Sequence, residues 1–210
     1  DGFLIPSMAQ KDEMSLSNLG RIRKDMFRRM VMPARGALRT SFIAKLTTEM
    51  KKIVEGNYHP ACRVNALVVL GELNRTEGNR STKALPRPEP GILPYMLEIL
   101  NSDKVDIKAK SFLTPTALAS IERHAAVRRP GTPNALSAGE VTEIGDTMLR
   151  LLAIEFEDQS DVDSDVVDWS KRRAVRILGT VGAVGNGGKY ANKLREIFND
   201  KNASSAMRID

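Results

Sequence analysis

Cysteine and aromatic residues are scarce in this chain, and long apolar runs do not occur. Its 210 residues include one cysteine, Cys62, so an internal disulfide cannot form, and a lone thiol does not distinguish a reducing compartment from an oxidising one. Aromatic residues make up 5% of the chain while nine residues are Met, so the core must consist of aliphatic side chains and Ala. No segment approaches the roughly 18 apolar residues that a membrane-spanning helix requires. The composition favours helices without a membrane span, and it assigns no localisation.

Charge is present in abundance, but it is unevenly distributed. The formal net charge is +6, and the segment 20–52 alone holds ten Lys or Arg against Asp25 and Glu49. The segment 155–168 carries seven acidic residues and no basic one. The sequence therefore predicts one basic and one acidic pole, which describe possible partners and not the fold.

Apolar spacing predicts helices arranged in consecutive pairs. Within 37–54 apolar residues recur at steps of three or four, and Gly56 ends this pattern. Pro60 suits the first turn of a second helix, which is apolar nearly all round to Leu73. The same pairing recurs, and Ser137 with Glu140 forms a capping box that marks one helix start. The later helices are expected at 92–100, 105–127, 141–154, 166–181 and 190–198.

The second helix of each pair repeats a short motif. The run Arg63-Val-Asn-Ala aligns with Lys108-Ala-Lys-Ser at an offset of 45 and with Lys171-Arg-Arg-Ala at an offset of 108. Residues 206–210, AMRID, are similar to residues 61–65, ACRVN, at the start of a second helix. We therefore expect the chain to be a fragment of a longer protein with further repeats. The connections 74–90 and 155–165 are rich in polar and turn-forming residues, and we expect both to be exposed and mobile.

The strings CRVNALVVLG and SKRRAVRILG resemble the second helix of HEAT repeats, in which a basic residue is followed by a small Ala and then by Leu-Gly. The strings YHPACRVNALVVLGELN, LASIERHA and DWSKRRAVRILGTVG also resemble large bacterial HEAT-domain proteins without an assigned activity. The resemblance implies an all-α fold, a right-handed α-solenoid of HEAT-like helical pairs. It places a basic capping helix in the N-terminal segment 1–36 and repeats in 37–210. The repeats are expected at about 37–74, 91–128 and 137–184, followed by a truncated repeat at 189–210.

A HEAT-like packing signature carries architecture without chemistry, so we expect a non-catalytic protein-binding scaffold. Second helices would line the inner face and bind the partner there. The two offsets and the helical spacing select the candidates for partner binding: Asn65, Glu72, Lys110, Arg173 and Arg176. The partner, the oligomeric state and the number of further repeats stay open.

The N-terminal basic helix gives an alternative function. Apolar Leu19, Ile22, Met26 and Met30 define one face, while the other face carries the candidates for anion binding: Arg21, Arg23, Lys24, Arg28 and Arg29. The alternative function is nucleic-acid binding through this helix or through the concave face of the repeats, whereas the helix could also simply cap the first repeat. Scarce aromatic residues limit base stacking and favour the cap. Some HEAT-like proteins are DNA glycosylases, for which Asp168 and Trp169 would be the residues to inspect.

Three motifs suggest ligand sites, and each has a simpler explanation. Asp161, Asp163 and Asp165 begin like a calcium loop, but the Gly and Glu that an EF-hand needs are missing, which leaves calcium binding at 155–168 undecided. His59 and Cys62 are half a zinc site without its other half. The glycine-rich run 179–190 lacks the residues of a phosphate-binding loop. We therefore assign no cofactor, metal or catalytic residue.

Overall fold

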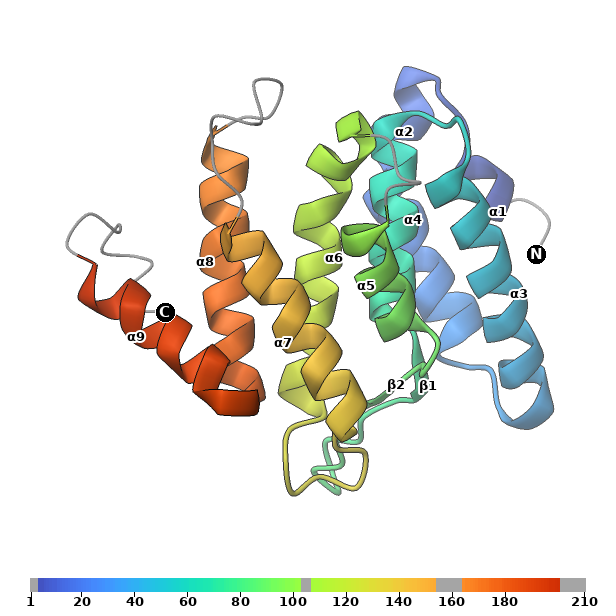
Figure 1. Cartoon of the computed structure of the whole chain (residues 1–210). Helices are drawn as coiled ribbons and strands as arrows, with labels where there is room; N and C mark the ends of the chain where they lie inside the picture. The colour runs from blue at the N-terminus through green and yellow to red at the C-terminus, as the bar shows by residue number, and fades with distance from the viewer. Residues whose placement is uncertain (1–3, 103–106, 154–163, 201–210) are drawn as a thin grey trace. The chain divides into compact units, whose positions relative to one another are not determined.

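The structure is a computed structural model that describes residues 4–102, 107–153 and 164–200. Most of the described residues are helical, as the spacing of apolar residues predicts (Figure 1). The chain divides into two compact units, Asp1–Ile92 and Leu93–Asp210, and each is described by itself. A single small β-hairpin interrupts the helices within the described part of the chain.

Unit 1 begins with a short helix, α1 (Leu4–Ser7), followed by the basic helix α2 (Glu13–Met26). Asp12 starts α2, because its carboxylate accepts a hydrogen bond from the Ser15 backbone N–H at 2.9 Å. The helix continues as a π-helical turn, η1 (Phe27–Val31), in which Met32 N–H bonds to the Phe27 carbonyl. Leu19, Met26 and Val31 are buried, so one face of this segment belongs to the core of unit 1.

Two helices, α3 (Gly36–Glu55) and α4 (Pro60–Glu72), form the predicted helical hairpin and pack on each other. Gly56 ends α3, and His59 caps α4 by accepting a hydrogen bond at Nδ1 from the Ala61 backbone N–H. Arg63 links the pair by donating to the Val54 carbonyl at 2.7 Å. The carbonyl that α3 leaves unpaired near its C-terminus is thus satisfied by the following helix.

The first turns of α3 are rotated relative to the face that the sequence predicts. Leu38 was expected on the apolar face but is 71% exposed, whereas Arg39 is 9% exposed. From Leu46 onward the predicted face is correct, since Leu46, Met50 and Ile53 are all buried. The reason is a set of carbonyl and carboxylate acceptors from distant segments, which draws the Arg39 guanidinium inward.

A β-hairpin follows α4 where the sequence predicts only an exposed connection. Strands β1 (Asn74–Thr76) and β2 (Arg87–Pro88) pair antiparallel, and an isolated bridge joins Asn79 to Ala84. Asn79 Oδ1 accepts from the backbone N–H groups of Ser81 and Thr82 at 2.9 and 3.3 Å, which shapes the turn. The expected exposure is correct for most of this segment, but its base is buried at Asn74 and Pro88.

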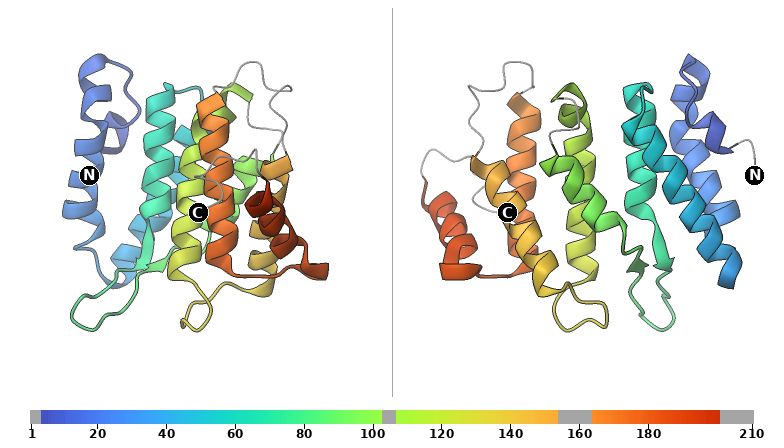
Figure 2. Two further views of the ribbon diagram at one scale, coloured as in Figure 1. Left: turned by 90° about the vertical axis from the view of Figure 1, so that its left-hand side faces the viewer. Right: turned by 45° about the vertical axis from the view of Figure 1, so that its right-hand side comes forward.

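Unit 2 contains the later helices at the positions that periodicity predicts. They are α5 (Ile92–Asn101), α6 (Ile107–Val127), α7 (Ala138–Ala153), α8 (Ser164–Val181) and α9 (Lys189–Asn199). Helix α8 packs against both α6 and α7, and Asn101 at the end of α5 donates to Thr147 of α7 at 3.0 Å (Figure 2). The part of the predicted truncated repeat at 201–210 lies outside the described residues.

The predicted capping box at the start of α7 is confirmed. Glu140 N–H donates to Ser137 Oγ at 3.3 Å, and Ser137 N–H donates back to Glu140 at 2.8 Å. Arg128, just after α6, adds two hydrogen bonds to the same carboxylate at 2.6 and 2.9 Å. Burial alone would raise the pKa of Glu140, but the hydrogen bonds from Arg128 and Ser137 outweigh it and hold that pKa below its usual value.

The glycine-rich run between α8 and α9 is a helix stop and turn, as the simpler explanation predicts. Gly185, Gly187 and Gly188 all have positive φ around the short 3₁₀ turn η3 (Asn186–Gly188). Tyr190, where a phosphate-binding loop would need Ser or Thr, is 2% exposed and packs over Gly145 of α7. Its hydroxyl donates to Asp146 at 2.7 Å, which joins α9 to α7.

Candidate functional site

The basic helix α2 presents most of its cations to solvent. Arg21 and Lys24 of α2 are exposed, as are Arg28 and Arg29 of the continuing turn η1, whereas Arg23 is half-buried against α4. Asp25 is the acid nearest to this face, and it bonds to Arg28 at 2.8 Å and lies 3.9 Å from Arg29. One carboxylate therefore serves two guanidinium groups, and the exposed face keeps a net positive charge.

Arg23 joins two groups of residues that the sequence assigns to different sites. Its Nη1 donates to Asn65 Oδ1 of α4 at 2.7 Å, and its Nε lies 3.7 Å from Glu72 of the same helix. Arg23, a predicted anion-binding residue, thus contacts two predicted partner-binding residues, Asn65 and Glu72. The expectation that Asn65 stands apart from the buried positions of α4 is wrong, because Asn65 is 5% exposed and α2 packs over that face. Glu72 remains exposed.

Two of the remaining partner-binding candidates come together in unit 2. Arg173 forms an ion pair with Glu122 of α6, and Arg176 Nε lies 3.6 Å from the same carboxylate. The Arg173 guanidinium also lies over the Trp169 ring, 4.6 Å from its centroid. We call Glu122, Trp169, Arg173 and Arg176 the α6/α8 cluster. The third candidate, Lys110, lies half-buried near the start of α6.

The sequence did not single out Glu122. Its neighbours in IERHA give no local signal, because its role depends on the packing of α6 against α8. For Trp169 the sequence offers only the comparison with HEAT-like DNA glycosylases. In the structure Asp168 is exposed, and the Trp169 ring is covered by Arg173.

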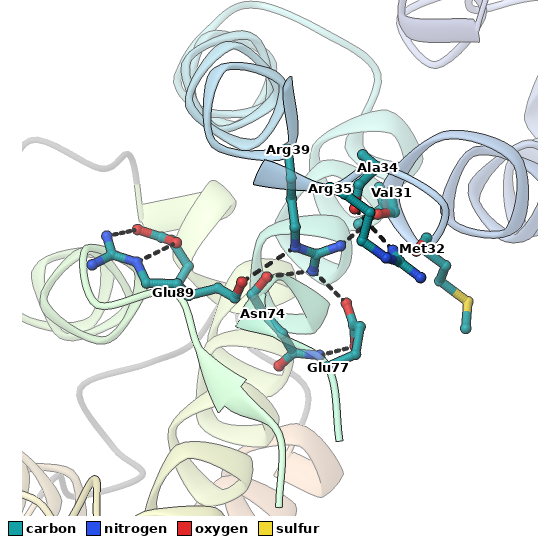
Figure 3. Close-up of polar contacts among 9 residues, drawn as sticks. Val31, Met32, Ala34, Arg35, Arg39, Asn74, Glu77 and Glu89 are labelled. Atoms are coloured by element: carbon teal, nitrogen blue, oxygen red, sulfur yellow. Dashed lines mark hydrogen bonds and ion pairs between the residues drawn. The ribbon is translucent and has the colours of Figure 1, made fainter. Parts of the chain in front are cut away.

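Arg39 organises a second polar centre, in unit 1 (Figure 3). Its guanidinium donates to the carbonyl oxygens of Val31, Asn74 and Arg75 at 2.5, 2.7 and 3.2 Å, and to Glu77 Oε1 at 2.6 Å. Because five N–H donors in a fixed plane suit several acceptors at once, Arg rather than Lys fits this position. Asn74 Nδ2 donates to the other oxygen of Glu77 at 2.7 Å.

A pocket of about 250 Å³ adjoins this centre. It is lined by Arg39, Thr40, Ile43, Ala44, Thr47, Lys51, Arg75, Glu89 and Gly91. Its lining includes three cations, Arg39, Lys51 and Arg75, and one carboxylate, Glu89. Arg75 Nη2 and Nε donate to the Glu89 carboxylate at 2.9 and 3.4 Å. The pocket is small and mostly apolar in its lining, and nothing in its geometry identifies a ligand.

His124 is fully buried on α6, and neither ring nitrogen has a hydrogen-bond partner among the described residues. Burial, reinforced by the charges of Arg123 and Arg128, lowers the pKa of His124 to about 3. The imidazole is therefore neutral near physiological pH. The expectation of a partly buried histidine is corrected to full burial.

His59 and Cys62 act as the simpler explanation predicts. His59 caps α4, and Cys62 is 0% exposed with its Sγ donating to the Gln10 carbonyl at 3.2 Å. Burial raises the pKa of the Cys62 thiol. Within the described ranges, no group of three or more His, Cys, Asp or Glu could hold a metal ion. Asp161 and Asp163 of the possible calcium loop lie outside those ranges.

None of the helices that the structure describes combines the length and apolar character needed to cross a membrane. Of the charged groups in the described residues, those that bear on the predicted sites belong to the exposed face of α2 and η1, the Arg39 centre and the α6/α8 cluster. Each of them could contact a partner or fix the fold.

Comparisons of the chain with protein-family models, with curated proteins and with solved structures each gave no match.

Proposed function

We propose that the chain is a protein-binding scaffold of HEAT-like repeats, a right-handed α-solenoid whose partner contacts the second helices α6 and α8. The α6/α8 cluster is the observation that supports this proposal. It crosses two neighbouring second helices and combines an aromatic ring with two guanidinium groups. Trp and Arg are the residue types most enriched among those that dominate binding energy in protein interfaces.

The cluster is ordered before any partner arrives. Arg173 is held by both the Glu122 carboxylate and the Trp169 ring, so little side-chain entropy is lost when it is contacted. Arg176 is more exposed, with half of its side chain accessible, and it can offer donors to an acceptor on a partner. Exposed Ala119 and Ala126 on α6 flank Glu122 by helical spacing and allow close approach.

The equivalent face of unit 1 is less accessible. Helix α2 packs on α4, and Arg23 contacts Asn65 and Glu72 there. This supports the capping role predicted for α2, because an end helix that covers the first repeat would occupy that face. The proposal therefore assigns partner binding to unit 2.

Photo-crosslinking in the complete chain tests the proposal. A crosslinking residue replaces Ala119 on the proposed face, and a matched one replaces exposed Ala153 at the end of α7. We expect a discrete crosslinked partner from position 119 alone. Combining this position with Arg173→Glu and Arg176→Glu should weaken capture about thirtyfold, as expected for losing about 2 kcal/mol at an interface centre.

The matched charge control is Arg129→Glu with Arg195→Glu, which changes the net charge equally at exposed positions of the same unit. Capture must survive this change. Identical products from positions 119 and 153, or capture that persists after the reversal at 173 and 176, would reject the α6/α8 face.

A further inference from the structure

The hairpin that follows α4 is a built feature of unit 1. Arg39 bonds to the carbonyl groups of Asn74 and Arg75 and to the Glu77 carboxylate, which together form the base of the hairpin (Figure 3). Pairing of β1 with β2 and the Asn79 turn then fix the rest. A buried arginine with four acceptors is a costly arrangement unless it orders the segment that it contacts.

The outer part of this hairpin is strongly basic. We call residues 78–88 the basic arm: it contains Arg80, Lys83 and Arg87, all exposed, and no acidic residue. Lys83 adopts a positive φ of 56°, which is uncommon for a residue with a side chain and places it in the turn. Ser81 and Thr82 add exposed hydroxyl groups between the cations.

The acids on either side of the basic arm already have partners. Glu77 accepts hydrogen bonds from Arg39 and Asn74, and Glu89 accepts two from Arg75. Both carboxylates are directed toward the base of the hairpin by these contacts. The charge of the arm is therefore not neutralised by the acids nearest to it in sequence.

More positive charge lies beside the base of the hairpin. The same Arg39 guanidinium that holds Asn74 also bonds to the Val31 carbonyl at the end of η1, so the two segments meet there. Arg28 and Arg29 belong to η1, and their side chains are 69% and 68% exposed. The basic arm and η1 thus contribute five exposed cations near the base of the hairpin. One carboxylate, Asp25, offsets part of this charge, because it lies 2.8 Å from Arg28 and 3.9 Å from Arg29.

We propose that the basic arm and η1 bind the phosphate backbone of double-stranded DNA. Charge complementarity carries the proposal, because Lys and Arg side chains that neutralise phosphates supply most of the sequence-independent affinity for DNA. A two-stranded ribbon also fits the major groove of B-form DNA, whereas the major groove of duplex RNA is too narrow. A membrane is the less suitable partner, because Leu85 is the one exposed large apolar side chain in the described residues of the basic arm and η1, and an interfacial segment needs a continuous apolar face.

Fluorescence anisotropy of a labelled random-sequence DNA duplex, titrated with the complete chain at several salt concentrations, tests this inference. The test variant carries Arg80→Gln, Lys83→Asn and Arg87→Gln, in which Asn tolerates the positive φ of position 83. Three lost phosphate contacts should weaken binding at low salt by about tenfold to a hundredfold. They should also reduce the slope of log affinity against log salt by about three.

The matched control carries Lys11→Gln, Lys45→Gln and Arg129→Gln, which removes the same charge from exposed positions outside the arm and η1. It should keep nearly all of the affinity. Equal losses in both variants would show that net charge alone attracts DNA and would overturn the proposal. Absence of binding to duplex DNA at low salt, equal affinity for duplex RNA, or tighter binding to phosphatidylserine-containing vesicles would overturn it as well.

A measurement on the unaltered protein keeps the test valid if the triple variant does not fold. Acetylation of lysine amino groups, followed by mass spectrometry, is compared with and without duplex DNA. The proposal requires protection of Lys83 and none of exposed Lys45. Unchanged labelling of Lys83 at saturating DNA would reject the arm as the contact. The inference does not rest on the α6/α8 face, so either can fail without the other.

Discussion

Arg23 of α2 donates from Nη1 to Oδ1 of Asn65 in α4, at a distance of 2.7 Å. This hydrogen bond spans 42 positions of sequence and fixes the basic helix on the first helical hairpin. The contact also changes the role expected for each of the two residues. Asn65 is an internal polar anchor instead of an exposed contact, and Arg23 is removed from the cationic face of α2.

Asn65→Ala is expected to lower the free energy of unfolding by about 1–2 kcal/mol, because a hydrogen bond to a charged donor in a partly buried site is lost. Urea denaturation followed by circular dichroism measures the effect. Exposed Asn192→Ala in α9 is the control, and it should change the unfolding free energy by less than about 0.5 kcal/mol. Equal stability of the Asn65 variant and the wild type would contradict the anchoring role.

Local patterns in the sequence were sufficient to predict the longer helices, but not the short helix α1 or the turn η1. Residues 37–54 were predicted as a helix that the structure places at Gly36–Glu55, since apolar spacing and Gly56 specify it locally. Helix α7 begins at Ala138, three residues before the first predicted apolar position, because its start is set by the Ser137 cap. The exposed Leu38 and buried Arg39 could not be predicted, since the acceptors for Arg39 come from residues up to 38 positions away.

Acid should destabilise unit 2 through His124. The imidazole is neutral in the folded protein because burial, with Arg123 and Arg128, lowers its pKa from 6.5 to about 3. Below pH 6.5 the unfolded chain gains a proton that the folded chain does not. The contribution of the neutral imidazole to the free energy of unfolding is therefore fully present above pH 6.5. It is lost progressively as the pH falls from 6.5 through about 3.

His124→Leu removes this linkage. We expect the dependence of the unfolding free energy on pH to become shallower in that interval, by up to about 1.4 kcal/mol per pH unit. Near neutral pH the variant should be at least as stable as the wild type. Its side chain of similar size replaces two buried ring nitrogens that have no hydrogen-bond partner among the described residues. Urea titrations over a pH series decide this, and parallel pH profiles for the two proteins would be the contrary result.

Gly145 is predicted to be the more sensitive of two helical glycines. A Cβ at Gly145 would lie 2.6 Å from Tyr190 Cε2, whereas a Cβ at Gly179 in α8 would meet no atom of the described residues within 4 Å. Gly145→Ala should therefore lower the free energy of unfolding by about 1–3 kcal/mol through overpacking. Gly179→Ala, the control, should be neutral or stabilise by up to about 1 kcal/mol through helix propensity. Thermal unfolding compares the two variants, and a gain in stability from Gly145→Ala would mean that Tyr190 does not occupy this contact.

The candidate sites were only partly predictable. Arg173 and Arg176 lie close together because both are on one helix and their separation is local, and their role in partner binding stays a prediction. Glu122, which bonds to both, comes from α6 and depends on helix packing that no local pattern encodes. The hairpin likewise depends on Arg39, a residue 35 positions before the Asn74 carbonyl that it holds.

The Arg39 centre also divides the hairpin into a base that the fold requires and a turn that the fold does not require. Its contacts end at Glu77, so residues 79–84 of the turn are exposed and make no demand on the helical core. Lengthening a flexible loop lowers the free energy of unfolding only slightly, by about 0.6 kcal/mol for each doubling of the loop length. The turn is therefore an insertion point, at which new sequences could be introduced during evolution or by design while the guanidinium keeps the base closed.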